Sequence, residues 1–190
     1  DKTYAGIKKE LSPYGVCGLD FKELEADEKK YVKKYFKEQI LPVLSPQIVD
    51  SSHPFPHLLN KDIYVTATLK YTAAKKEQKE QILGIVPVPT YVSDILMLPG
   101  HDIRYIRMEK VIMEYLNLVF DQYEVSDPNY ICVTRNADVS PDDEALEVTD
   151  DFRKLMQSTL HKRRRMAVVR LETAEKLTPE MQEYFCKKFK

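Results

Sequence analysis

Residues 131–172 have the sequence ICVTRNADVSPDDEALEVTDDFRKLMQSTLHKRRRMAVVRLE, and they decide the fold class. The β-branched residues at 131–134 predict a short strand, and the apolar residues at 166–171 predict a second one. Between them, Ser140 and Pro141 mark the start of a helix with three carboxylates in its first turn. A strand, a helix and a strand in close succession predict helices packed against a sheet.

The rest of the chain extends this pattern on both sides. Apolar spacing predicts helices over residues 27–41 and 108–120, and alternation predicts strands over 63–69, 82–88 and 101–107. Residues 14–19 could form a short strand, residues 91–98 an extended segment or turn, and the prolines within 45–56 favour a loop. We expect one α+β domain over 1–190, with a small mixed or antiparallel sheet of about five strands, and 1–42 as a helical lead-in.

The composition is that of an ordinary globular protein. Of the 190 residues, 43% are hydrophobic and 31% are charged, and the net charge is -1, so no global field attracts nucleic acid or a membrane. Five glycines and no tryptophan disfavour Gly-rich nucleotide loops. The chain begins at Asp1 and stops within a helical pattern, which suggests a piece of a longer protein.

Metal and redox sites are not predicted. Cys17, Cys132 and Cys186 lie far apart without a CxxC pair, which disfavours zinc and favours reduced thiols in the cytosol. His53 and His57 have a spacing that suits a metal only on a helix, and the prolines between them exclude a helix. Phe55, between these prolines, is instead expected to anchor a rigid loop on the core.

Catalytic and membrane-spanning motifs are also missing from the sequence. No Ser/His/Asp set, HExxH, P-loop or GxGxxG pattern can be assembled. No apolar run approaches the roughly 20 residues that a bilayer-spanning helix needs. The sequence therefore predicts no catalytic or metal-ligating residue in this chain, and a cytoplasmic location with peripheral membrane association left open.

Positive charge is concentrated at the end of the predicted 141–162 helix, in His161-Lys162-Arg163-Arg164-Arg165. Two interpretations stand: these cations complement the negative end of the helix dipole, or they contact a polyanion. Arg170 on the following strand and Arg135 at the end of the neighbouring one could share the same sheet edge. For Arg135 the alternatives are a turn in which it pairs with Asp138, and a phosphate or interdomain contact.

Five ordered blocks resemble the middle, or head, domain of the polyphosphate kinase family of the first type. Leu44-Ser45-Pro46 with Asp50 and HPFP at 53–56 matches one block, and 88–99 resembles the family's VP…LPRFVxLP segment. YIRMEKVI at 105–112 resembles the family's FVPLEDVI. VTRNAD at 133–138 is nearly the family's most recognisable string in this region. Residues 163–172 resemble RRFGxxVRLE. Ser93-Asp94 and Arg165-Met166 depart from the family's Pro-Arg and Phe-Gly.

The resemblance implies a role within a larger enzyme that transfers the terminal phosphate of ATP to polyphosphate, with magnesium and a phosphohistidine. Those motifs belong to other domains of the family, so this piece alone is expected to be inactive and to need no cofactor. The head domain of the family is associated with dimers or higher oligomers and with shaping the polyphosphate channel. Candidate polyphosphate or interdomain contacts are Arg135, Lys162, Arg163, Arg164 and Arg170.

Alternatives from other classes are a free-standing RNA-binding module and a protein-interaction module. The first would use the basic helix end with sheet tyrosines such as Tyr64 and Tyr130, but the neutral net charge opposes it. The second would use Tyr31 and Tyr35 as a contact surface, with core packing of both as the alternative. The favoured partners are other domains of the same enzyme and a second copy, with polyphosphate as a possible ligand and no nucleic acid.

Overall fold

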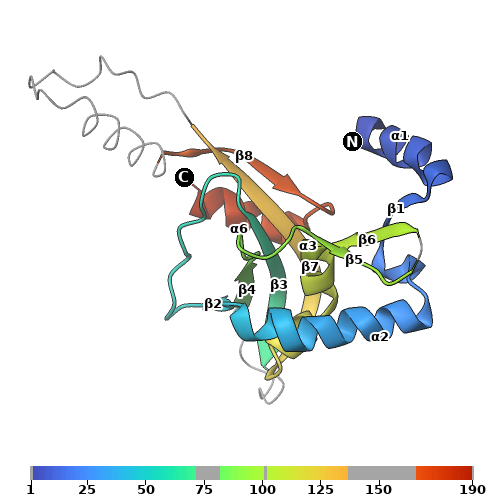
Figure 1. Cartoon of the computed structure of the whole chain (residues 1–190). Coiled ribbons are helices and arrows are strands. Elements are labelled where there is room, and N and C mark those ends of the chain that lie inside the picture. The colour runs from blue at the N-terminus through green and yellow to red at the C-terminus, as the bar shows by residue number, and fades with distance from the viewer. Residues whose placement is uncertain (1, 72–81, 101, 137–165, 190) are drawn as a thin grey trace, which may run out of the picture. The chain divides into compact units, whose positions relative to one another are not determined.

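The computed structural model describes residues 2–71, 82–100, 102–136 and 166–189 (Figure 1). Helices and sheets are both present, which confirms the α+β class. The chain divides into two compact units: Asp1–Pro54 with Tyr64–Tyr130, and Phe55–Ile63 with Ile131–Lys190. The prediction of one domain over 1–190 stays a prediction.

The elements follow the predicted order closely. Along the chain they are α1 (Lys2–Leu11), η1 (Ser12–Tyr14), β1 (Val16–Leu19), η2 (Phe21–Glu23), α2 (Ala26–Tyr35), η3 (Phe36–Ile40), η4 (Leu41–Val43), β2 (Gln47–Val49), β3 (Ile63–Tyr71), β4 (Ile82–Pro87), β5 (Ile95–Met97), β6 (Ile103–Arg107), α3 (Met108–Glu114), α4 (Leu116–Val119), β7 (Tyr123–Arg135), β8 (Val168–Thr173) and α6 (Pro179–Lys188). The predicted 141–162 helix lies outside the described residues.

The predicted 27–41 helix is confirmed as α2, continued by the π-helical η3. Its start is fixed by a capping box, in which the Glu25 backbone N–H donates to Glu28 Oε2 at 2.8 Å. Val32, Phe36 and Ile40 lie on one side and are buried in the core of the first unit. Burial of this stripe holds α2 against the strands.

The strands form two sheets. The larger has the order β2-β4-β3-β7-β8, and β7 supplies residues to both units; the smaller has the order β1-β6-β5. Strand β6, predicted as part of one sheet, pairs in parallel with β1 in the smaller sheet instead.

The prediction of a continuous loop over 45–56 is wrong at its start. Gln47–Val49 forms β2, which pairs antiparallel with β4. Pro46 precedes this segment and Pro54 and Pro56 follow it, so no proline interrupts the three paired residues. An edge strand needs hydrogen bonds on only one side, which makes such a short segment sufficient.

The core of the first unit is dense around Gly84 in β4. A Cβ built on Gly84 would lie 2.8 Å from Phe120 Cζ and 3.0 Å from Leu69 Cδ1. Both neighbouring side chains are buried, so they have little room to move. Glycine at this position lets the Phe120 ring pack directly on the sheet.

The second unit is built around aromatic packing on α6. The Phe55 ring lies edge-on to those of Tyr184, Phe185 and Phe189, with centroids 6.3, 6.2 and 5.5 Å away. Such edge-to-face pairs stabilise beyond simple burial. The prediction that Phe55 anchors its proline-rich loop on a core is therefore confirmed.

Candidate functional site

Arg135 lies at the end of β7, where the pairing with β8 shifts register. Its guanidinium donates through Nε and Nη2 to the carbonyl oxygen of Leu58, at 3.0 and 2.8 Å. Nη1 donates to the carbonyl oxygen of Met166 at 2.6 Å. The backbone N–H of Arg135 donates to Asn60 Oδ1 at 2.8 Å. One arginine thus joins the 57–61 loop to the strand ends.

These contacts test neither interpretation of Arg135 drawn from the sequence, and both stay predictions. Asp138, the predicted partner, lies outside the described residues. Among the described residues the guanidinium bridges two backbone carbonyls, and His57 Nδ1 lies 3.4 Å from Nη2. Hydrogen bonds from a charged donor are stronger than neutral ones, so Arg135 fixes the loop that begins at Phe55.

Arg170 occupies a more exposed place on β8. It lies opposite Thr134, the residue before Arg135, and its Nη2 is 2.7 Å from Glu172 Oε1. The structure therefore brings Arg135 and Arg170 to adjacent positions of one strand pair, with their guanidinium groups engaged by different partners. Lys162, Arg163 and Arg164 lie outside the described residues, so their place beside these two stays a prediction.

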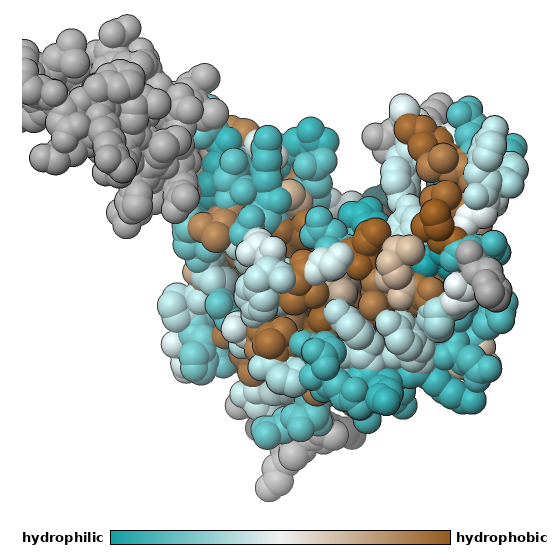
Figure 2. All heavy atoms as spheres, in the orientation of Figure 1, coloured by the Kyte–Doolittle hydropathy of each residue, from teal (hydrophilic) through white to brown (hydrophobic). Residues whose placement is uncertain are grey.

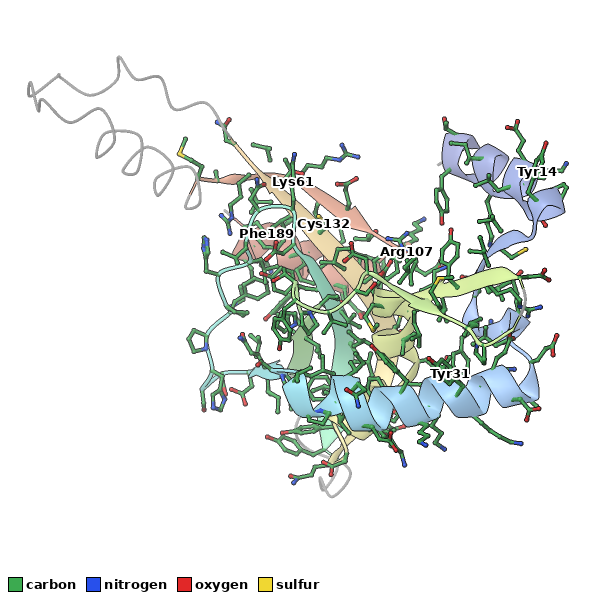
Figure 3. All side chains as sticks on the ribbon, viewed as in Figure 1. Tyr14, Tyr31, Lys61, Arg107, Cys132 and Phe189 are labelled. Atoms are coloured by element: carbon green, nitrogen blue, oxygen red, sulfur yellow. The ribbon has the colours of Figure 1, made fainter. Side chains whose placement is uncertain are left out.

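Charges near Cys132 on β7 are balanced. Burial raises the pKa of the Cys132 thiol, Glu172 and Asp62 raise it further, and Arg170 and Lys61 oppose this. Figure 3 labels Lys61 and Cys132 on this part of the second unit. Lys61 has φ of 65°, and its N–H donates to the Val133 carbonyl at 2.8 Å. Cations and carboxylates alternate here, so the described edge is not a purely basic surface.

The loop after β2 holds an aspartate–histidine pair. Asp50 Oδ1 accepts hydrogen bonds from the backbone N–H groups of Ser52 and His53, both at 2.8 Å, and lies 2.9 Å from His53 Nδ1. The His53 ring, together with these backbone donors, holds the pKa of the Asp50 carboxyl below its usual range. The pair closes the turn that leads into the Phe55 loop.

The described parts of the chain contain neither a metal-binding cluster nor a membrane-spanning helix. Among those residues, no group of three or more His, Cys, Asp or Glu side chains is placed to hold a metal ion. Every described helix is too short or too polar to span a lipid bilayer. Tyr64 is buried, which removes it as a stacking platform for RNA bases.

Sequence reasoning missed two features. One is the acceptor role of the Leu58 carbonyl and the Asn60 side-chain oxygen, because a backbone carbonyl leaves no mark on the sequence and the Asn60 contact depends on the tertiary fold. The other is a run of lysines on α2 and η3, at 29, 30, 33, 34 and 37, whose spacing of three and four could have been recognised.

The comparisons point to one family. The family model described as "Polyphosphate kinase middle domain" matches residues 27–190. A polyphosphate kinase of Bacillus cereus is 36% identical over 164 residues, covering 85% of this chain and 23% of that protein. One of Halalkalibacterium halodurans is 34% identical over 169 residues, covering 88% and 23%.

A solved structure shows the same fold. The crystal structure of polyphosphate kinase from Porphyromonas gingivalis superposes with a TM-score of 0.71 at 24% identity, covering 98% of this chain and 25% of that one. The chain thus spans about a quarter of the length of the proteins that it matches.

Proposed function

This chain belongs to the polyphosphate kinase family as a middle domain, and we propose that it serves as a non-catalytic part of a longer ATP:polyphosphate phosphotransferase. Its role there is to hold domains and subunits together and to shape the path of the polyphosphate chain. The observation that carries this proposal is the family match over residues 27–190, which includes the whole five-stranded sheet. ATP and magnesium would act in other domains of the enzyme.

The Arg135 contacts support a structural role for the second unit. A guanidinium that joins Leu58 and Met166 makes the 55–63 loop and the strand ends one rigid body within that unit. A rigid element is what a domain needs in order to position its neighbours, because flexible supports lose the geometry required for phosphoryl transfer.

Polyphosphate contacts are the second part of the proposal. Arg170, Lys162, Arg163 and Arg164 would meet the polymer as electrostatic positioning groups, and Arg135 would support them from the strand end. Arg170 is exposed on β8, so its guanidinium could exchange Glu172 for a phosphate.

The test is a titration of this chain with long-chain sodium polyphosphate at two salt concentrations. Beside it stands a variant with Lys162, Arg163, Arg164 and Arg165 changed to Ala. We expect binding that weakens with salt and is lost in the variant, since each phosphate contact releases counterions. Salt-insensitive binding, or equal binding by the variant, would overturn the contact role of these residues.

The assembly role has its own test. Sedimentation of the chain over a range of concentrations should show self-association, or association with the remaining domains of a family member supplied as a separate polypeptide. A chain that stays monomeric and binds neither would reject the assembly role. A phosphotransfer assay on the chain alone is expected to give no activity, and turnover there would reject the non-catalytic assignment.

A further inference from the structure

One side of α2 and η3 carries five lysines, which we name the α2 lysine face: Lys29, Lys30, Lys33, Lys34 and Lys37. At 3.6 residues per turn these positions fall within about 140° of the helix circumference. All are exposed except Lys29, which is half-buried with its Nζ 5.9 Å above the Phe21 ring. Figure 2 shows hydrophilic surface over α2, and Figure 3 labels Tyr31 on the same helix.

Of the acidic residues near this face, Glu25 and Glu28 contact Arg104, Asp27 pairs with Lys30 of the face itself, and Glu38 is exposed with no ion pair among the described residues. Glu28 Oε1 lies 2.9 Å from Arg104 Nε, and Glu25 Oε1 lies 3.6 Å from Arg104 Nη1. Asp27 pairs with Lys30 at 3.0 Å. Within the described parts of the chain, this leaves Lys33, Lys34 and Lys37 with no carboxylate at ion-pair distance.

Helix stability explains only part of the arrangement. Lys29 and Lys33, like Lys30 and Lys34, are like charges four residues apart, and such pairs destabilise a helix. The helix dipole favours Lys33 and Lys34 in the last turn of α2, but it does not favour Lys29 and Lys30, which lie in the first half of the helix. The face therefore carries a repulsion that an anionic ligand would relieve.

We infer that the α2 lysine face is a binding surface for polyphosphate, an inference that rests on the proposed function. Neighbouring side chains on a helix are about 5–6 Å apart, which is less than the Debye length of about 8 Å at physiological salt. Their potentials therefore add. A linear polymer that carries charge on every phosphate can contact several of these lysines at once, in many registers.

The experiment compares two triple variants of the chain, each removing three positive charges. In the face variant Lys33, Lys34 and Lys37 become Gln; in the control, the exposed and scattered Lys9, Lys70 and Lys176 become Gln. Binding of long-chain sodium polyphosphate is measured at several salt concentrations. We expect the face variant to lose about tenfold or more in affinity, and its log–log salt slope to fall by about 2, while the control changes little.

Thermal unfolding supplies a second readout. Without polyphosphate the face variant should unfold at the same or a higher temperature than the parent chain, because repulsion has been removed. With polyphosphate, the parent chain should gain more thermal stability than the face variant. This combination separates a lost ligand contact from a damaged fold.

The outcomes distinguish this inference from the proposed function. Binding kept by the face variant but lost by the 162–165 variant would overturn the inference and leave the proposed contacts standing. Equal loss in the face variant and the scattered control would also overturn it. Absence of binding by the parent chain would reject the inference together with the proposed polyphosphate contacts, and sedimentation would still test the assembly role.

Discussion

Two groups of cations in this chain are held in opposite ways. Arg104 and Arg135 direct their guanidinium groups to Glu28 and to the Leu58 and Met166 carbonyls. On the α2 lysine face, Lys30 pairs with Asp27, whereas Lys33, Lys34 and Lys37 have no described carboxylate at ion-pair distance. Planar, multidentate guanidinium suits the first task, and separate point charges suit the second. The availability of acceptors, more than the density of charge, separates a structural cation from a binding one.

Loss of the Arg104 partner should give the largest effect. Glu28→Gln leaves Arg104 without its buried carboxylate, so the free energy of unfolding should fall by about 3 kcal/mol. Urea unfolding at neutral pH measures this. Glu25→Gln is the matched control, since Glu25 is exposed and contacts Arg104 only at 3.6 Å, and it should change stability by less than about 0.5 kcal/mol. If Glu28→Gln and Glu25→Gln lowered the free energy of unfolding equally, the Arg104–Glu28 pair would contribute no more than an exposed ion pair.

Removal of Arg135 should give the second largest loss of stability. Arg135→Ala leaves the Leu58 and Met166 carbonyls without their donor, and we expect a loss of about 2 kcal/mol in urea unfolding. Arg170→Ala removes only an exposed pair and should cost about 0.5 kcal/mol or less. If Arg135→Ala left the free energy of unfolding unchanged, the 57–61 loop would be held by Phe55 packing alone.

Reversal of one charge on the α2 lysine face should raise the free energy of unfolding, whereas the two preceding changes lower it. Lys33→Glu replaces repulsion with two attractive pairs, toward Lys29 and Lys37, and should raise the free energy of unfolding by about 1 kcal/mol. High salt should reduce this gain, because the pairs are exposed. A destabilised Lys33→Glu protein would show that Lys33 already has a structural partner.

The Asp50 turn should give a small pH effect. The folded pKa of Asp50 lies below its unfolded value of about 3.9, so its contribution is present above that pH. As pH falls through the folded pKa the contribution is lost, because the unfolded state binds protons first. Stability of Asp50→Asn should therefore decline less between about pH 5 and pH 2 than that of the parent chain. If the stability of Asp50→Asn and that of the parent chain fell equally with pH, the stabilising role of the Asp50 carboxylate would be contradicted.

The hydrophobic pattern of the sequence predicted much of this fold, and particular residues show which elements it could not predict. The stripe of Val32, Phe36 and Ile40 identified α2, and the prolines around Phe55 identified an anchored loop. Strand β2 was missed because its three residues are stabilised by pairing with β4 rather than by their own pattern.

The candidate site was harder to predict for a physical reason. Arg135 was singled out from the VTRNAD string, but its contacts with the main-chain oxygens of Leu58 and Met166 could not be predicted, because these depend on the tertiary fold. The α2 lysine face could be recognised from spacing. The lack of acidic partners for Lys33, Lys34 and Lys37 became visible only when Glu25 and Glu28 were seen paired with Arg104.

The contact between Gly84 and Phe120 restricts how this sequence can diverge. No side chain larger than hydrogen fits at Gly84 while the Phe120 ring stands 2.8 Å from the position of its Cβ. A smaller residue at position 120 would open that space and leave a void unless position 84 gained the lost volume. Substitutions at positions 84 and 120 are therefore expected to occur together among descendants of this chain, with a larger residue at 84 accompanied by a smaller one at 120.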